Sequence, residues 1–259
     1  MRQKKRIFQA LGAMAIHDFT SQRLFVDAPL SAGALIPCTS PQANYLLNVL
    51  RMGEGDTLLV FNGRDGEWQV VTENVRKRDC TLRALVQIRP QSAGPDVDYL
   101  FAPLKHSRLD YMVQKAAEMG VRRLRPVITR RTIAGRVNLE RMSANAIEAA
   151  EQCGVLHVPD IMAPAKLEAV LDSWPANRRL IVCDERAQAA TPVAALLDLE
   201  PGPIAVLIGP EGGFDPAERE RVLAQPGALA ISLGPRIMRA DTAAVAALAL
   251  INATMGRGW

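Results

Sequence analysis

The sequence predicts an α/β domain with a parallel sheet, preceded by a smaller and mostly antiparallel β domain. Short β-branched or alternating runs fill the chain from Arg23 to about Arg89. A stretch rich in proline, serine and glycine at 90–96 is typical of a linker. Beyond it, apolar runs of strand length alternate with helical patterns. We therefore expect a β domain at 23–89 and an α/β domain at 97–259.

The first 22 residues resemble neither domain. They begin with a cluster of basic residues and continue into a short apolar run at 7–16. That order imitates a signal peptide, but Gln9 and Gly12 leave the run short. We interpret residues 1–22 as a disordered basic leader.

Strands of the first domain are expected at 23–26, 57–62, 67–75 and 80–88, with a tight turn at 62–66 and a helix at 42–51. In the second domain the expected strands are 97–103, 122–129, 158–161, 179–183, 204–208 and 228–233. The expected helices are 108–120, 138–153, 166–173, one that opens at Asp215, and an apolar, buried one at 242–255. Asp215, Pro216 and Glu218 form a typical helix start.

Positive charge marks two candidate RNA surfaces. The net charge is +4, and the excess lies in the first third of the chain, where an antiparallel barrel is expected. A second concentration of arginine falls between residues 122 and 141. Basic surfaces of this kind attract phosphates. The candidate RNA-binding residues are Arg23, Arg51, Arg64, Arg122, Arg130 and Arg131.

Two glycine-rich loops are the strongest functional signal. The runs 204–208 and 228–233 have the length of buried parallel strands, and each ends in a glycine-proline pair. We expect the two loops to lie side by side at the carboxyl edge of one sheet, with one glycine-terminated strand beside the other. This edge is where α/β sheets bind ligands. Bare backbone groups there can hold a small molecule.

Several ligand classes are excluded. The stretch 204–251 contains no lysine, as a P-loop requires, and the glycines come too late in the chain for a dinucleotide fingerprint. The four cysteines are scattered, so we expect no metal site, and no apolar run is long enough for a membrane. An uncharged or cationic cofactor remains, and the sulfonium of S-adenosylmethionine (SAM) fits.

These residues resemble a known family. LIGPEGGF (207–214) and LGPRIMRADTA (233–243) are similar to the signature of the 16S ribosomal RNA uridine-N3 methyltransferases, which belong to the SPOUT (α/β-knot) superfamily. Matching segments run in the family's order from Arg23 onward: RLFVD (23–27), NYLLNVLRMGEGD (44–56), LKHSRLDYMVQKAAEMGV (104–121) and IEAAEQCG (147–154).

The resemblance implies a PUA-like RNA-binding barrel followed by a SPOUT-type, trefoil-knotted parallel sheet. From the residues alone, an open doubly wound sheet would be expected. The resemblance also implies a cytoplasmic homodimer that uses SAM to methylate N3 of a uridine in the decoding region of 16S rRNA, within the 30S subunit and without a metal. The implied cofactor-binding residues are Leu207, Gly209, Glu211, Gly212, Gly213, Leu233, Gly234, Ile237 and Met238.

Methylation at N3 requires loss of a proton and places negative charge on the ring oxygens. Arg239 is the candidate to stabilise that charge, and Asp241 or Glu211 the candidate to accept the proton. Two structural alternatives stay open. Asp241 is also a candidate N-cap of the last helix, and Arg239 a candidate ion-pair partner of Glu211.

The sequence departs from the family's pattern after Arg239. A threonine and a glutamate usually follow this arginine, whereas this chain has Ala240 and Asp241. Asn44 and Val155 replace a histidine and an arginine. Two other functions therefore remain as alternatives. One is a SPOUT methyltransferase that acts on tRNA or another rRNA position. The other is a non-catalytic RNA-binding factor in ribosome assembly.

Overall fold

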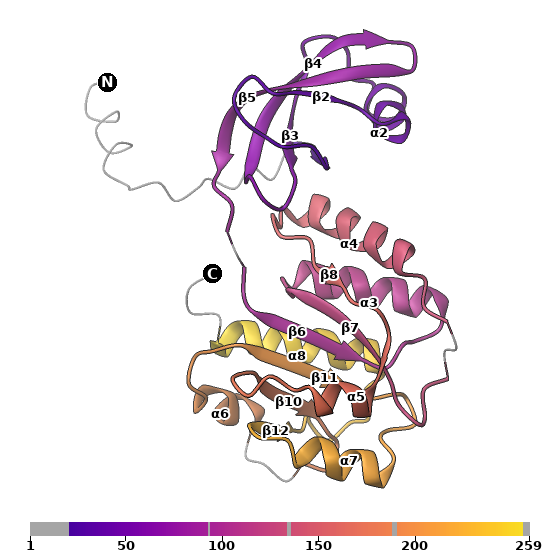
Figure 1. The fold of residues 1–259 in the computed structure, drawn as a ribbon, viewed down its shortest axis with the longest axis vertical. Helices are drawn as coiled ribbons and strands as arrows, with labels where there is room; N and C mark the ends of the chain where they lie inside the picture. Colours follow the sequence, from indigo (N-terminus) through magenta and orange to yellow (C-terminus); the bar gives the residue numbers. More distant parts are fainter. Residues whose placement is uncertain (1–20, 93, 134–135, 188–190, 256–259) are drawn as a thin grey trace, which may run out of the picture. The chain divides into compact units, whose positions relative to one another are not determined.

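Two units make up the chain, Met1–Ser92 and Ala93–Trp259. The structure is a computed structural model and describes residues 21–92, 94–133, 136–187 and 191–255. The predicted leader, 1–22, therefore lies outside the described residues except for Ser21 and Gln22. Figure 1 follows the helices and strands of both units along the chain.

Within residues 21–92 the first unit is built on a five-stranded sheet with the order β1-β3-β4-β5-β2. β1 runs parallel to β3, and the other neighbouring strands are antiparallel. The predicted strands are present, and the sequence missed β2, which is too short to show an alternating pattern. The strands are β1 (Arg23–Phe25), β2 (Leu35–Pro37), β3 (Thr57–Phe61), β4 (Glu67–Arg76) and β5 (Asp79–Arg89).

The predicted turn and helix of this unit are both held by local hydrogen bonds. The Asn62 side chain accepts from the backbone N–H groups of residues 64 and 65, which closes the turn between β3 and β4. Helix α2 (Ser40–Asn44) begins at a capping box between Thr39 and Gln42. It continues into the wider π turn η1 (Tyr45–Val49), so the predicted helix at 42–51 starts and ends two residues earlier than expected.

A buried ion pair corrects one prediction for this unit. Arg23 was expected to contact RNA, but its side chain is only 5% exposed and donates from Nε to Oε1 of Glu67 over 2.9 Å. Arg89 donates to the same carboxylate, at 2.7 and 2.8 Å. Glu67 is 1% exposed, and a carboxylate buried to that degree needs paired charge. Arg23 is therefore a structural residue and is not available to a phosphate.

The second unit is an α/β domain, as predicted. Among its described residues a seven-stranded sheet has the order β12-β10-β11-β6-β7-β8, with β9 paired to β7, and its strand pairs are parallel. The sequence missed the two-residue strand β9. The strands are β6 (Val97–Phe101), β7 (Arg123–Ile128), β8 (Asp160–Ile161), β9 (Ala165–Lys166), β10 (Arg179–Cys183), β11 (Ile204–Ile208) and β12 (Ala228–Ile231).

Helices cover both faces of this sheet, because its strands carry apolar side chains on both faces. On β11, Ile204, Val206 and Ile208 enter one core cluster, while Ala205 and Leu207 enter another. The first cluster packs against α3 (His106–Glu118), α4 (Leu139–Cys153), α6 (Pro192–Leu197) and α8 (Ala240–Met255), and the second against α5 (Leu167–Asp172) and α7 (Pro216–Leu223).

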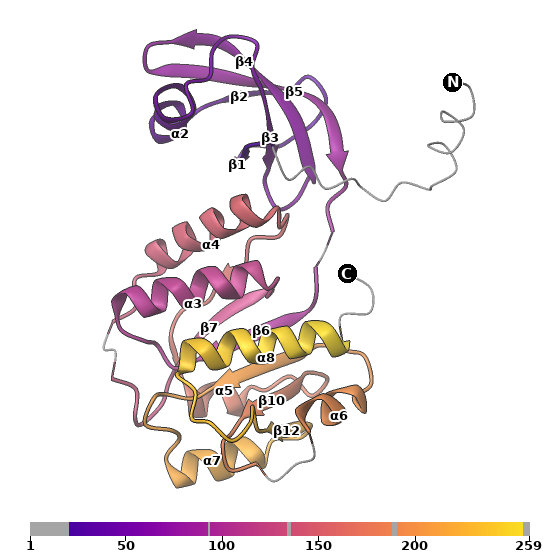
Figure 2. The same ribbon diagram turned by 180° about the vertical axis from the view of Figure 1, so that it is seen from behind.

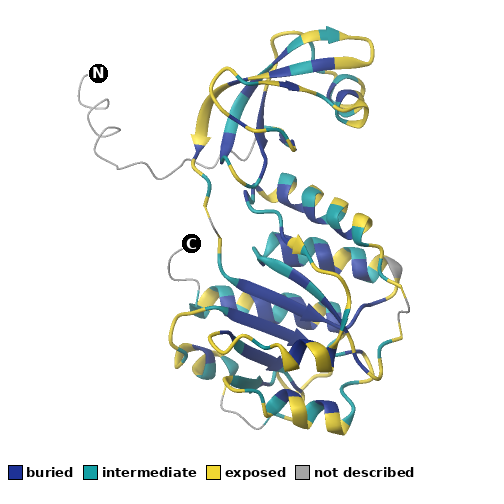
Figure 3. Ribbon diagram, viewed as in Figure 1, coloured by how far each residue is buried: buried dark blue, intermediate teal, exposed yellow. Residues whose placement is uncertain are grey.

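Figure 2 shows α8 alongside α3 on one face, and Figure 3 shows the central strands buried throughout. The sequence missed α6, and α8 begins two residues before the predicted start. Residues such as Ala247 and Ile251 are buried against the sheet, whereas Ala249 on the opposite side of α8 is exposed. No helix among the described residues has the length and apolar character needed to span a membrane.

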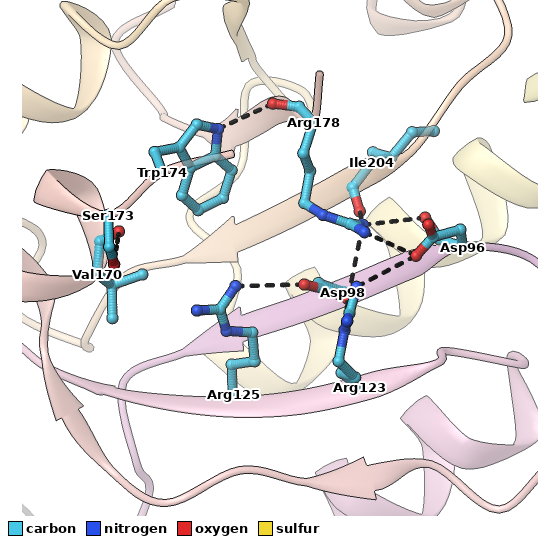
Figure 4. Close-up of polar contacts among 9 residues, drawn as sticks. All are labelled: Asp96, Asp98, Arg123, Arg125, Val170, Ser173, Trp174, Arg178 and Ile204. Atoms are coloured by element: carbon cyan, nitrogen blue, oxygen red, sulfur yellow. Dashed lines mark hydrogen bonds and ion pairs between the residues drawn. The ribbon is translucent and has the colours of Figure 1, made fainter. Parts of the chain in front are cut away.

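Charged side chains hold the amino edge of the sheet together. Asp98 of β6 is 1% exposed, and it accepts from Arg123 Nε at 2.6 Å and from Arg125 Nη1 at 3.3 Å, both on β7. Arg178, which precedes β10, reaches the same carboxylate at 3.6 Å and donates to the Ile204 carbonyl at 2.8 Å. Figure 4 shows these side chains converging from separate strands.

Replacing Asp98 is expected to destabilise the second unit strongly. Asp98→Asn removes a buried negative charge beside Arg178, whose side chain is only 7% exposed, and this should cost about 3 kcal/mol of unfolding free energy. Asp172→Asn is the matched control, because that side chain is 65% exposed in its ion pair with Arg221 and should cost less than about 1 kcal/mol. Urea denaturation measures both. Equal losses would contradict the role given to Asp98.

Candidate functional site

Both glycine-rich segments leave the carboxyl edge of the parallel sheet, as predicted. Loop 209–215 follows β11, and loop 232–239 follows β12. The two strands are not neighbours, because β10 lies between them in the sheet. The expectation that one glycine-terminated strand lies beside the other is therefore wrong. A side chain from a third segment links the chain beyond β11 to the chain beyond β12.

That side chain is Arg108, in the first turn of α3. Its Nη2 and Nε donate to the two carboxylate oxygens of Asp241 at 3.0 and 3.1 Å. Its Nη1 also donates to Oε1 of Glu211. Glu211 belongs to loop 209–215, and Asp241 lies in the first turn of α8, directly after loop 232–239. One guanidinium therefore ties the two glycine loops together.

This contact sets the charge state of the site. Hydrogen bonds from Arg108 lower the pKa of Asp241, and burial opposes the shift without cancelling it. The two carboxylates in turn raise the pKa of Arg108. Asp241 therefore stays ionised and is a weaker proton acceptor than an ordinary aspartate. Glu211 forms its ion pair with Arg108 and not with Arg239, which had been considered as its partner. Helix α8 begins at Ala240, so Asp241 lies inside the helix and is not its N-cap.

Loop 209–215 is shaped by its own residues. The Phe214 ring packs on Gly209 so closely that a Cβ there would lie 2.8 Å from it. Gly213 has φ +68° and donates to the Pro210 carbonyl at 2.8 Å, which closes a turn. Asp215 then caps α7 in a box with Glu218, as predicted. A Cβ on Gly212 would make an ordinary contact with the Arg131 side chain, at 3.7 Å, so a methyl group fits at that position.

Loop 232–239 is the more exposed of the two. Gly234 has φ +112°, and a Cβ there would have no neighbour within 4 Å. Ile237 is 97% exposed, whereas Leu233 and Met238 pack partly against the core. Leu207, at the end of β11, has its side chain buried in the opposite core. Only main-chain groups of Leu207 are therefore available to a ligand.

Arg130 and Arg131, predicted to bind RNA, lie against loop 209–215. Arg131 Nη1 donates to the Gly212 carbonyl at 2.8 Å. Arg130 Nη1 donates to Oδ1 of Asp215 at 2.9 Å, and its backbone N–H donates to Glu218 at 2.7 Å. Both side chains are exposed and support the loop from the end of β7. The other candidate RNA-binding arginines lie elsewhere. Arg51 is exposed, Arg64 forms a surface ion pair with Asp27, and Arg122 is partly buried.

Arg239 is exposed on loop 232–239, and the ion pairs found among the described residues do not include it. Its guanidinium is therefore free to meet a ligand. Within the described ranges, no group of three or more histidine, cysteine, aspartate or glutamate side chains is placed to hold a metal. The site offers backbone groups and ionised side chains as its means of binding.

The prediction from sequence missed Arg108. It stands within the segment 104–121 that carries part of the family resemblance, but its partners lie 103 and 133 residues further along the chain. No spacing rule connects residues so far apart. The available signal was a basic residue in the first turn of α3, at the edge where both acids were already expected.

The chain is similar to known RNA methyltransferases. The RNA methyltransferase domain family matches residues 91–252, and the RNA methyltransferase PUA domain matches residues 39–85. The chain is 28% identical to the ribosomal RNA small subunit methyltransferase E of Rickettsia conorii, over 89% of this chain and 94% of that protein. It is 30% identical to the protein of the same name from Synechocystis sp., over 90% of this chain and 78% of that one.

A solved structure from Legionella pneumophila, named as a methyltransferase in complex with SAM, is similar to the whole described fold. It is 28% identical with a TM-score of 0.78, and the match covers 90% of this chain and 97% of that chain. The predicted fold class, a PUA-like domain followed by a SPOUT-type α/β-knot domain, is confirmed.

Removing Arg108 should change the titration of Asp241. In the folded protein Asp241 stays ionised even below the usual aspartate pKa of about 3.9. The ion pair between Asp241 and Arg108 therefore contributes its full stabilisation above that pH. The contact is lost as the pH falls through the lowered folded-state pKa. Arg108→Met should return the pKa of Asp241 towards its usual value, measured by carboxyl carbon NMR. Arg219→Met, which breaks an ion pair with Asp184 instead, is the control, and an unchanged Asp241 pKa in Arg108→Met would contradict the coupling.

Proposed function

The chain belongs to the RNA methyltransferase domain family, and from that premise we propose that it uses SAM to methylate N3 of a uridine in the 16S rRNA of the small ribosomal subunit. The observation that carries the proposal is the pair of glycine loops that Arg108 joins at the carboxyl edge of the sheet. The names of the small-subunit relatives, and the SAM in the Legionella structure, support the substrate and the cofactor.

The residues at this edge fit SAM. Gly212 is exposed, and Gly213 and Gly234 have positive φ with no atom within 4 Å of a Cβ position, which leaves main-chain groups accessible to an adenosine or a methionine moiety. The carboxylates of Glu211 and Asp241 provide the negative charge that a sulfonium favours. The other residues proposed to hold the cofactor are Leu207 and Gly209 in the first loop, and Leu233, Ile237 and Met238 in the second. When bound, SAM supplies the methyl group.

The charged residues divide the remaining work between them. Arg239 donates to a carbonyl oxygen of the uracil ring and stabilises the negative charge that develops when N3 loses its proton. Glu211, about half exposed, accepts that proton. Asp241 is assigned the positioning of Arg108 in place of the base role, because its lowered pKa makes it the poorer acceptor.

The departures from the family pattern are compatible with this site. Ala240 is buried against the apolar core of α8, where a methyl group packs without a hydrogen-bonding partner. Asp241, although shorter than glutamate, still reaches Arg108 with both of its oxygens. The assembly-factor alternative therefore loses its main argument.

The RNA partner is proposed to bind along arginines of both units. These are Arg51 and Arg64 in the first unit, and the exposed Arg130 and Arg131 with the partly buried Arg122 in the second. The match of residues 39–85 to a PUA domain of RNA methyltransferases supports a contribution from the first unit. We propose further that the enzyme is a cytoplasmic homodimer that acts on the 30S subunit.

Gly212→Ala tests the cofactor site without disturbing the fold. The added methyl group makes only an ordinary contact with Arg131, so the thermal midpoint should not change. It occupies the space proposed for SAM, and affinity should fall about tenfold or more, which corresponds to about 1.4 kcal/mol. Calorimetric titration with SAM measures this. Gly202→Ala, on an exposed loop, is the matched control, and equal affinity in both variants would refute the pocket.

Arg239→Ala tests the reaction and the modified position together. RNA from a deletion strain should lack one N3-methyluridine in 16S rRNA, and the purified protein should restore it on small subunits. Arg239→Ala should lower turnover about 100-fold and leave SAM affinity within about twofold. Arg236→Ala, an exposed arginine of the same loop, is the control. A missing methyl group in tRNA, or at another rRNA position, would identify the alternative enzyme.

A further inference from the structure

Residues at the start of α3 and of α4 line a half-open cavity of about 960 Å³. The other lining residues are Ile133, Arg136, Val137 and Asn138, which lie between β7 and α4. Small-molecule sites usually have volumes between about 300 and 1,000 Å³. The cavity is therefore large enough for a nucleotide, and the site described above does not account for it.

The polar wall of the cavity carries a small excess of positive charge, because Lys105, Arg136 and Arg141 are opposed by Asp110 and Glu140. Arg141 binds Asp110 through two hydrogen bonds of 2.8 and 2.6 Å, and Asn145 donates to the same carboxylate at 2.9 Å. The charge of Asp110 is thus already balanced. Lys105 and Arg136 are both exposed, and the ion pairs found among the described residues do not include either of them. These two cations are available to an anionic group.

The opposite wall is apolar. Leu104, Leu109 and Met142 are buried at its base. Ile133 at its rim is 69% exposed, although a branched aliphatic side chain gains from being covered. A ligand that combines a flat, weakly polar ring with a phosphate would cover this wall and meet the two cations. A nucleotide of an RNA strand has that combination.

The position of the cavity indicates which nucleotide. Lys105 and Leu109 flank Arg108 on α3, and Arg108 turns to Glu211 and Asp241, where the base to be methylated is proposed to lie. The cavity is thus lined by residues on either side of Arg108 in the chain. We propose that it binds a nucleotide adjacent to the methylated one, with the ring against Ile133 and the phosphate on Lys105 and Arg136. This inference rests on the proposed function, because it takes the substrate to be RNA.

The phosphate contacts are tested by reversing the two charges. Arg136→Glu and Lys105→Glu should each weaken binding to small subunits from the deletion strain about tenfold or more, measured without SAM. Each should also lower the slope of log affinity against log salt by about one. SAM affinity should not change. Arg186→Glu, an exposed arginine of the same unit, is the charge control. RNA affinities like those of the control would overturn the proposal.

The ring contact has a separate test. Ile133→Asn should weaken binding to the same subunits about fivefold or more and leave the salt slope unchanged, because no cation is removed. A wild-type affinity for this variant would overturn the placement of the ring. The proposed function is judged on a different measurement, methyl transfer by the wild-type protein. An enzyme that methylates small subunits, while the cavity variants bind them normally, would disprove the cavity alone.

Discussion

A carboxylate buried at the amino edge of the parallel sheet organises the second unit. Asp98 on β6 holds Arg123 and Arg125 of β7, and it lies within reach of Arg178, whose guanidinium also binds the chain at the start of β11. Such a group is stable only when every partner is in place. The strands are thereby held in register at the edge opposite to the one from which loops 209–215 and 232–239 leave.

At that opposite edge the same chemistry serves function. Arg108 holds Glu211 and Asp241 from two segments that follow non-adjacent strands. Because a side chain joins the two loops, they need no backbone hydrogen bonds to each other. Their backbone N–H and C=O groups can then bind a ligand. The arrangement fixes the charges of the site and keeps Asp241 ionised, which explains why this acid is assigned to positioning and Glu211 to proton transfer.

The arginines show how limited charge patterning is as a guide to function. Arg23 and Arg64 are both basic residues of the first unit, yet one is sealed against Glu67 and the other is open at the surface. Arg130 and Arg131 are exposed and also brace the glycine loop. Arginines in buried ion pairs must therefore be left out when positive charge is used to predict an RNA-binding surface.

The sequence by itself determined the local elements and the site's location. Alternating or continuous apolar runs, the Asp215 cap and the glycines after β11 and β12 depend on neighbouring residues, and these were predicted closely. Short pieces such as β2, β9 and α6 carried too few residues to show a period. Only the tertiary structure decided that β10 separates the two glycine-terminated strands, that Arg23 is buried and that Arg108 joins Glu211 to Asp241. The physical reason is that such contacts join residues far apart in the chain, which no local pattern encodes.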